Sequence, residues 1–151
     1  MNLRVNRADC SRIEETLRLF EGYLRFYQCE PAPGKARAFI LDRLLRQDSV
    51  IFLAELDGAS VGFTQLYPAF ASLSMAPSWI LNDLYVEPAG RGKGVAAALM
   101  EAARQLAVDT GAAEIFLQTA RDNSTAQSLY AGLGYQRDDH FLVYTLSLPS
   151  P

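Results

Sequence analysis

The chain has 151 residues, of which half are hydrophobic and 21% are charged, and its formal net charge is −3. This composition is typical of one globular domain with its own core and excludes a disordered chain. The lack of a basic stripe argues against nucleic acid as a partner, and no apolar run approaches the ~20 residues of a membrane-spanning helix.

Helices and strands are predicted from two periodicities of the apolar residues. Apolar residues three or four positions apart predict amphipathic helices, whereas alternating or β-branched runs predict strands. Pro68 is expected to end the strand in which it lies. In chain order we expect a strand at 3–7, helices at 9–30 and 36–47, strands at 50–56, 61–67 and 79–86, a helix at 92–110, a strand at 115–117, a helix at 123–133, and one or two strands within 135–148. This order predicts an α/β fold in a single domain, 1–151, with a mixed β-sheet flanked by helices.

The cysteines and the single histidine do not suggest a metal site. Cys10, Cys29 and His140 are too few and too far apart for the ligand set of zinc. Two reduced thiols are favoured over a disulfide, and His140 is expected at the surface or in strand pairing rather than as a base. The N-terminus lacks the apolar segment of a signal peptide, which favours a cytoplasmic location.

The most informative local feature is a glycine-rich loop between a predicted strand and a predicted helix, Arg91-Gly92-Lys93-Gly94-Val95-Ala96. The first N–H groups of a helix lack internal partners and carry the positive end of the helix dipole, so this place favours an anion. Glycine lets the backbone approach a ligand closely, and the two cations add full positive charges. The loop is therefore predicted to bind a diphosphate.

Three other interpretations of the loop are weaker. A P-loop needs Ser or Thr after its lysine to bind magnesium, but Gly94 follows Lys93. Gly92, Gly94 and Ala97 fit a dinucleotide-binding fingerprint. That fingerprint also requires an acidic residue at the end of the next strand, and Glu114 stands at its start. A purely structural loop leaves the two interleaved cations unexplained.

The strand, loop and helix resemble motif A of the GNAT N-acetyltransferases, R/Q-x-x-G-x-G/A, with Arg91, Gly94 and Ala96 in its fixed places. The segment 123–135, NSTAQSLYAGLGY, resembles the family's N-x-x-A-x-x-L-Y-x-x-x-G-[FY] motif. Both motifs have the family's spacing, and the resemblance extends over nearly the whole chain. It implies the GNAT-like (acyl-CoA N-acyltransferase) fold and direct transfer of the acetyl group of acetyl-CoA to an amine, with no metal.

The resemblance also implies roles at the cofactor. The Leu84 N–H would point at the thioester oxygen and stabilise the developing negative charge. Tyr130 takes the place of the family's general acid, and a phenol with a pKa of about 10 suits a thiolate leaving group; the alternative is that Tyr130 only packs on its helix. Asn123 either caps its helix alone or also lies near the pantetheine. The implied CoA-binding residues are Leu84, Tyr85, Val86, Arg91, Gly92, Lys93, Gly94, Val95, Ala96, Asn123, Ala126 and Tyr130.

The strand before the loop also contains the two residues considered for the role of catalytic base, Asn82 and Asp83. Strand alternation is expected to place Asn82 with Leu84 on one face and Asp83 with Tyr85 on the other. Relatives that acetylate polyamines tend to show a Glu-Asp pair where this chain has Asn82-Asp83, and an amide cannot act as a base. Deprotonation of the amine by Asp83, by water or by solvent stays open, and so does a structural role for Asp83.

The acceptor is expected to be a primary amine of a small molecule, such as a polyamine, an amino acid or an aminoglycoside-like compound. A protein or peptide amine, and a CoA-binding module without catalysis, are the alternatives. Family members often form homodimers, but the sequence shows no interface. Five aromatic residues are expected mostly in the core, with one or two left to line an acceptor pocket: Phe26, Tyr27, Tyr67, Phe70 and Trp79.

Overall fold

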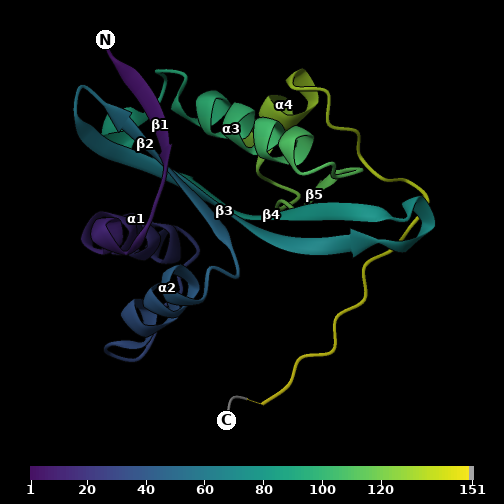
Figure 1. The fold of residues 1–151 in the computed structure, drawn as a ribbon, viewed down its shortest axis with the longest axis horizontal. Coiled ribbons are helices and arrows are strands. Elements are labelled where there is room, and N and C mark those ends of the chain that lie inside the picture. The colour runs from purple at the N-terminus through teal and green to yellow at the C-terminus, as the bar shows by residue number, and fades with distance from the viewer. Residues whose placement is uncertain (150–151) are drawn as a thin grey trace. The chain divides into compact units, whose positions relative to one another are not determined.

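The computed structural model describes residues 1–149. The chain forms two compact units, Met1–Gln118 and Thr119–Pro151. The first unit contains a sheet with the strand order β1-β2-β3-β4-β5 (Figure 1). Neighbouring strands are antiparallel except β4 and β5, which are parallel because a helix connects them. Its elements are β1 (Leu3–Arg7), α1 (Ile13–Phe26), α2 (Lys35–Arg46), β2 (Val50–Leu56), β3 (Ala59–Ala71), β4 (Ala76–Val86), α3 (Val95–Asp109) and β5 (Ile115–Leu117), with short 3-10 turns at Cys10–Arg12, Ser72–Ser74 and Pro88–Gly90.

Helices α1 and α2 cover one face of this sheet and α3 covers the other, so the predicted mixed sheet flanked by helices is confirmed (Figure 1). On the first face, Phe63 of β3 packs with Phe20 of α1 and Ile40 of α2. On the second face, Ala54 of β2 packs with Leu99 of α3. Both cores form because the apolar stripes of the helices meet the apolar residues of the pleated strands.

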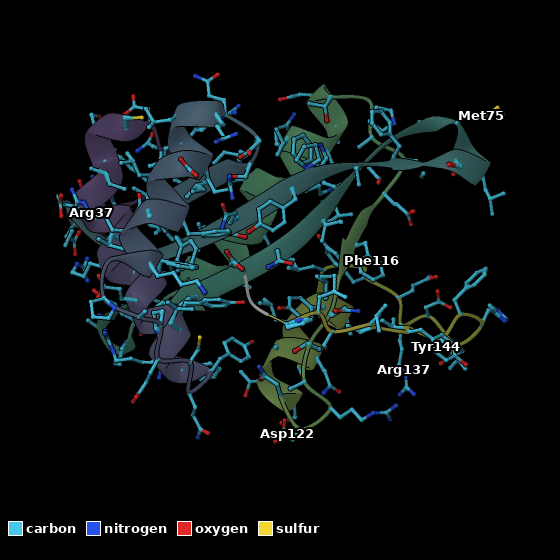
Figure 2. The ribbon with its side chains drawn as sticks, turned by 90° about the horizontal axis from the view of Figure 1, so that it is seen from below. Arg37, Met75, Phe116, Asp122, Arg137 and Tyr144 are labelled. Atoms are coloured by element: carbon cyan, nitrogen blue, oxygen red, sulfur yellow. The ribbon has the colours of Figure 1, made fainter. Side chains whose placement is uncertain are left out.

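Strand β3 is longer than predicted, because it continues through Pro68 to Ala71. Strand β2 pairs with β3 only as far as Leu66, so the rest of β3 has a sheet neighbour on one side alone, namely β4. Proline is tolerated at such a free edge, and the prediction that Pro68 ends the strand is wrong. Met75 lies at the exposed tip of the resulting β3–β4 hairpin (Figure 2).

The second unit contains one helix, α4 (Ser124–Gly132), followed by a segment without regular structure up to residue 149. The prediction of one or two strands within 135–148 is therefore wrong. Apolar residues such as Phe141, Leu142 and Tyr144 support a strand by propensity, but a strand also needs a neighbour for its backbone groups. In the structure these side chains are exposed and the segment pairs with no strand among residues 1–149.

The remaining sequence predictions concern metal, thiols and membranes. Cys10 and Cys29 are both free and exposed, and His140 is exposed as expected. Among residues 1–149, no His, Cys, Asp and Glu side chains gather as a group that could hold a metal ion. In the same part of the chain, every helix is too short or too polar to cross a membrane.

Candidate active site

The site is built around the point where β4 separates from β5. Strand β5 pairs with β4 only from Trp79 to Leu81. Among residues 1–149, the stretch 82–86 has a strand neighbour only on the β3 side. The second half of β4 therefore presents one open backbone edge, to which a ligand can add hydrogen bonds as a strand would.

The direction of the β4 backbone shows which groups face this open edge. The carbonyl oxygen of Asp83 accepts a hydrogen bond from Thr64 Oγ1 of β3 at 2.8 Å. A Cβ added at Gly62 of β3 would lie 3.0 Å from the carbonyl oxygen of Tyr85. Residues 83 and 85 thus direct their backbone groups to β3, and because these directions alternate, the N–H of Leu84 faces the open edge. This is the direction that the predicted role of Leu84 requires.

The glycine-rich loop follows β4 and leads into α3. Gly92 and Gly94 have φ angles of 71° and 78°, and nothing lies within 4 Å of a Cβ added at either position. The first bond of the helix runs from Ala98 N to Gly94 O at 3.0 Å. Residues 91–94 form a turn, and the N–H groups of 95–97 precede this first bond, so they have no partner one turn earlier within α3. N–H groups at the start of a helix, beside open space at two glycines, are an arrangement that favours an anion.

The two cations of the loop are held by its own backbone. Arg91 Nε donates to the carbonyl oxygen of Val86 at 3.0 Å, and Lys93 Nζ donates to that of Ala89 at 3.0 Å. Each contact uses one donor and leaves the other N–H groups of the side chain for a ligand. Both side chains are therefore positioned at the loop while their charges stay available.

Strand β4 contains a bulge at Asn82. In the pairing of β3 with β4, Gln65 lies opposite Asp83, but the next residue, Leu66, lies opposite Leu81. Asn82 therefore has no partner in β3 and is the extra residue of the bulge. Asn82 Nδ2 donates to Asp83 Oδ1 at 2.9 Å. The prediction that these two side chains lie on opposite faces is wrong, because the bulge interrupts the alternation. Beyond the bulge, alternation holds as predicted for the pair Leu84 and Tyr85.

Asp83 is the centre of a buried polar network. It is only 2% exposed, and its Oδ2 accepts from Gln65 Nε2 at 2.6 Å, while Ser49 Oγ donates to Gln65 Oε1 at 2.8 Å. The hydroxyl of Tyr23 is within hydrogen-bonding reach of the same carboxylate. Burial raises the pKa of Asp83, and its hydrogen bonds offset this only in part. Burial and then the charge of Asp83 raise the pKa of Tyr23 and of Tyr67.

Three members of this network, Ser49, Gln65 and Tyr23, are not predicted from the sequence. A glutamine inside an otherwise apolar strand is the one local signal for it. The expectation that most of the five aromatic residues lie in the core is also wrong. Trp79 is buried and Tyr67 is half-buried, whereas the other three are exposed. Tyr67 is the member of this set whose pKa responds to the charge of Asp83.

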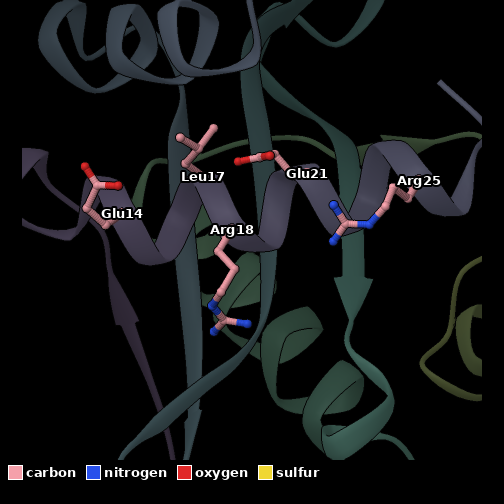
Figure 3. A pocket seen from close by; sticks show the side chains of 5 residues that line it. All are labelled: Glu14, Leu17, Arg18, Glu21 and Arg25. Atoms are coloured by element: carbon pink, nitrogen blue, oxygen red, sulfur yellow. The ribbon is translucent and has the colours of Figure 1, made fainter. Parts of the chain in front are cut away.

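A surface pocket lies along α1, lined by Glu14, Leu17, Arg18, Glu21 and Arg25 (Figure 3). All of its lining residues come from one helix, and none belongs to β4 or to the loop. We therefore do not assign it to the diphosphate. Arg18 nevertheless connects α1 to the loop region, because it forms an ion pair with Glu87, the residue that follows β4.

The second motif lies in the second unit. Asn123 Oδ1 accepts from Ala126 N at 3.1 Å, so the predicted cap of α4 is confirmed. Tyr130 is half-buried on α4, and its ring centroid lies 6.0 Å from that of Tyr135. The main chain joins the same two residues, since Tyr135 N donates to Tyr130 O at 3.0 Å. The motif thus folds as a capped helix with an aromatic pair at its end.

Known proteins resemble this chain over almost its full length. The model of the Acetyltransferase (GNAT) family matches residues 14–135. The N-acetyltransferase YhfO of Bacillus subtilis is 42% identical over 150 residues, which cover 99% of each chain. The crystal structure of a probable acetyltransferase is 38% identical with a TM-score of 0.91 and covers 98% of this chain and 99% of that one.

The chain therefore belongs to the GNAT acetyltransferase family, and it is an acetyltransferase of that type. A more distant relative is the aminoglycoside N(6')-acetyltransferase type 1 of Salmonella typhimurium. It is 24% identical over 107 residues, which cover 68% of this chain and 74% of the relative.

Proposed function

We propose that the protein uses acetyl-CoA as co-substrate and binds its diphosphate at the loop 91–96. The observation that carries this proposal is the start of α3, where the N–H groups of 95–97 precede the first bond of the helix, next to Arg91 and Lys93. Such an array satisfies phosphate oxygens, and the start of α3 adds the positive end of its dipole. Open space above Gly92 and Gly94 admits the ligand, so the residues present fit the group.

The chain's own groups then supply the chemistry of acetyl transfer. The Leu84 N–H, directed to the open edge of β4, donates to the thioester oxygen as negative charge develops there. Tyr130 donates a proton to the leaving thiolate. Asp83 is the carboxylate that receives the proton of the acceptor amine. The family model spans both compact units, which supports the proposal that residues 1–151 act as one N-acetyltransferase domain.

The acceptor that we propose is a primary amine of a small molecule. The relative from Salmonella typhimurium, named for an aminoglycoside, supports this class. The buried carboxylate of Asp83 supports a cationic acceptor, because no ion pair among residues 1–149 includes it. A buried charge without an opposite charge beside it is unfavourable, even when it is hydrogen-bonded, and an ammonium group nearby would relieve it. A cytoplasmic location and a homodimer stay predictions.

The test measures free thiol released from acetyl-CoA with a panel of a polyamine, amino acids, an aminoglycoside and a peptide. We expect turnover with a small amine and a loss of about 100-fold or more in Tyr130→Phe. The control is Tyr144→Phe, which removes the hydroxyl of an exposed tyrosine in the same unit. Turnover with the peptide alone would contradict the acceptor class, and tight CoA binding without any turnover would indicate a binding module.

A further inference from the structure

The carboxylate of Asp83 is in an unusual position for a group that takes up a proton. It is 2% exposed, so an acceptor that arrives from solvent cannot touch it directly. Its two oxygens are already engaged by the side-chain amides of Gln65 and Asn82. A neighbouring group that lies beside the carboxylate and is partly exposed would give the proton a path to it.

Tyr23 lies beside the carboxylate and is partly exposed. Its hydroxyl is within hydrogen-bonding reach of the Asp83 carboxylate and lies 3.5 Å from the carbonyl oxygen of Asn82. Unlike the buried Gln65, the side chain of Tyr23 is only half-buried. A hydroxyl is also both a donor and an acceptor, whereas the amide groups on Asp83 only donate there. Tyr23 is thus the neighbour of Asp83 that can pass a proton onward.

The position of Tyr23 is fixed by packing against the sheet. A Cβ added at the preceding residue, Gly22, would lie 2.7 Å from the ring of Tyr85 of β4. Glycine at this position therefore lets α1 approach β4 closely enough for Tyr23 to reach Asp83. The ring of Tyr23 also packs edge-on against Phe63, with centroids 5.9 Å apart. These contacts hold the hydroxyl in place before any substrate binds.

We infer that Tyr23 is a catalytic proton relay between the ammonium group of the acceptor and Asp83. The ammonium gives one proton to the Tyr23 oxygen while the hydroxyl proton moves to an Asp83 oxygen. The products are a neutral amine, a neutral phenol and a neutral carboxylic acid, so no phenolate forms and charge is conserved. The amine lone pair then attacks the acetyl carbon. This inference rests on the proposed function.

The surroundings of the relay favour this direction of transfer. Burial raises the pKa of Asp83, which brings the acid closer to the proton donor. The titratable groups around it are Tyr23 of α1, with Tyr27 beside it, and Tyr67 of β3, which also senses Arg43 and Asp48. Of these groups, only Tyr23 lowers the pKa of Asp83. Tyr67 therefore provides the matched control.

The first experiment compares Tyr23→Phe with Tyr67→Phe in acetyl transfer to the best small amine. We expect kcat to fall about 100-fold in Tyr23→Phe near neutral pH and less than about threefold in Tyr67→Phe. The deficit should shrink as pH rises, because more of the amine loses its proton in solvent. The double variant Tyr23→Phe/Asp83→Asn should be no slower than the slower single variant, since both residues serve one step.

The second experiment needs no acetyl-CoA. Carboxyl carbon NMR, assigned with Asp83→Asn, follows the titration of Asp83 in the free protein. The pKa of Asp83 should rise in Tyr23→Phe, which loses a hydrogen bond that lowers it, and stay unchanged in Tyr67→Phe. An unchanged pKa in Tyr23→Phe, or a rate deficit that is constant with pH, would overturn the relay. A third outcome separates the two proposals. If the wild-type protein acetylates no amine but the pKa of Asp83 still rises in Tyr23→Phe, the proposed function is wrong and the interaction of Tyr23 with Asp83 is supported.

Discussion

Two polar regions, the loop that follows β4 and the network around Asp83, use their hydrogen-bonding groups in opposite ways. In the loop after the strand, the N–H groups of 95–97 precede the first bond of α3, and both cations keep free donors. Around Asp83 the donors and acceptors are used within the protein, from Ser49 through Gln65 to the carboxylate. The loop is suited to bind an outside charge, whereas the network holds a charge of its own. Changes in the loop should therefore affect binding, and changes in the network should affect stability.

The largest expected effect is on stability, in Gln65→Leu. This change leaves the Asp83 carboxylate buried with one donor fewer, and we expect a loss of about 2 to 3 kcal/mol in the free energy of unfolding, measured by urea denaturation. The matched control is Gln105→Leu, because Gln105 makes a similar bond of 2.7 Å, to Asp109, on the exposed side of α3. That change should stay within about 0.5 kcal/mol. Equal losses at both sites would contradict the stabilising role of the buried network around Asp83.

The loop should give the reverse result in Gly94→Ala, with Gly34→Ala as its control. Both glycines precede a helix with φ of 78°, and neither has an atom within 4 Å of an added Cβ. Each variant should lose about 1 kcal/mol of stability from the left-handed backbone alone. Only Gly94→Ala should also weaken CoA binding, by about tenfold or more in isothermal titration, because the added carbon enters the ligand's space. Equal CoA affinity in the two variants would contradict the diphosphate site.

The same contrast explains what the sequence predicts and what it does not. The loop is a local feature, since the order of glycines, cations and helix within 91–96 determines its backbone and charge. The network joins the residue before β2, the middle of β3, the bulge of β4 and one turn of α1. Its members are far apart in sequence, and the bulge at Asn82 depends on how β3 and β4 align. No local pattern specifies that alignment.

The errors in the predicted elements have the same origin. Whether Pro68 ends a strand depends on where β2 stops pairing with β3, which is a property of the whole sheet. Whether the apolar residues within 135–148 form a strand depends on a neighbour for their backbone, and their alternation contains no information about it. The helices and the loop are predicted well because their signals lie within a few turns of chain.

The smallest expected effect is on the pH dependence of stability, compared between Asp83→Asn and Asp9→Asn. The native pKa of Asp83 is raised by burial, so the native protein binds more protons than the unfolded chain above about pH 3.8. The stability of the wild type relative to Asp83→Asn should therefore fall as pH rises from that value through the native pKa. The pKa of Asp9 is instead lowered by hydrogen bonds from Ser11, so its contribution should be lost as pH falls below about 3.8. Urea denaturation between about pH 3 and pH 8 gives both differences, and the same sign for the two variants would show that Asp83 is not destabilised as a buried charge.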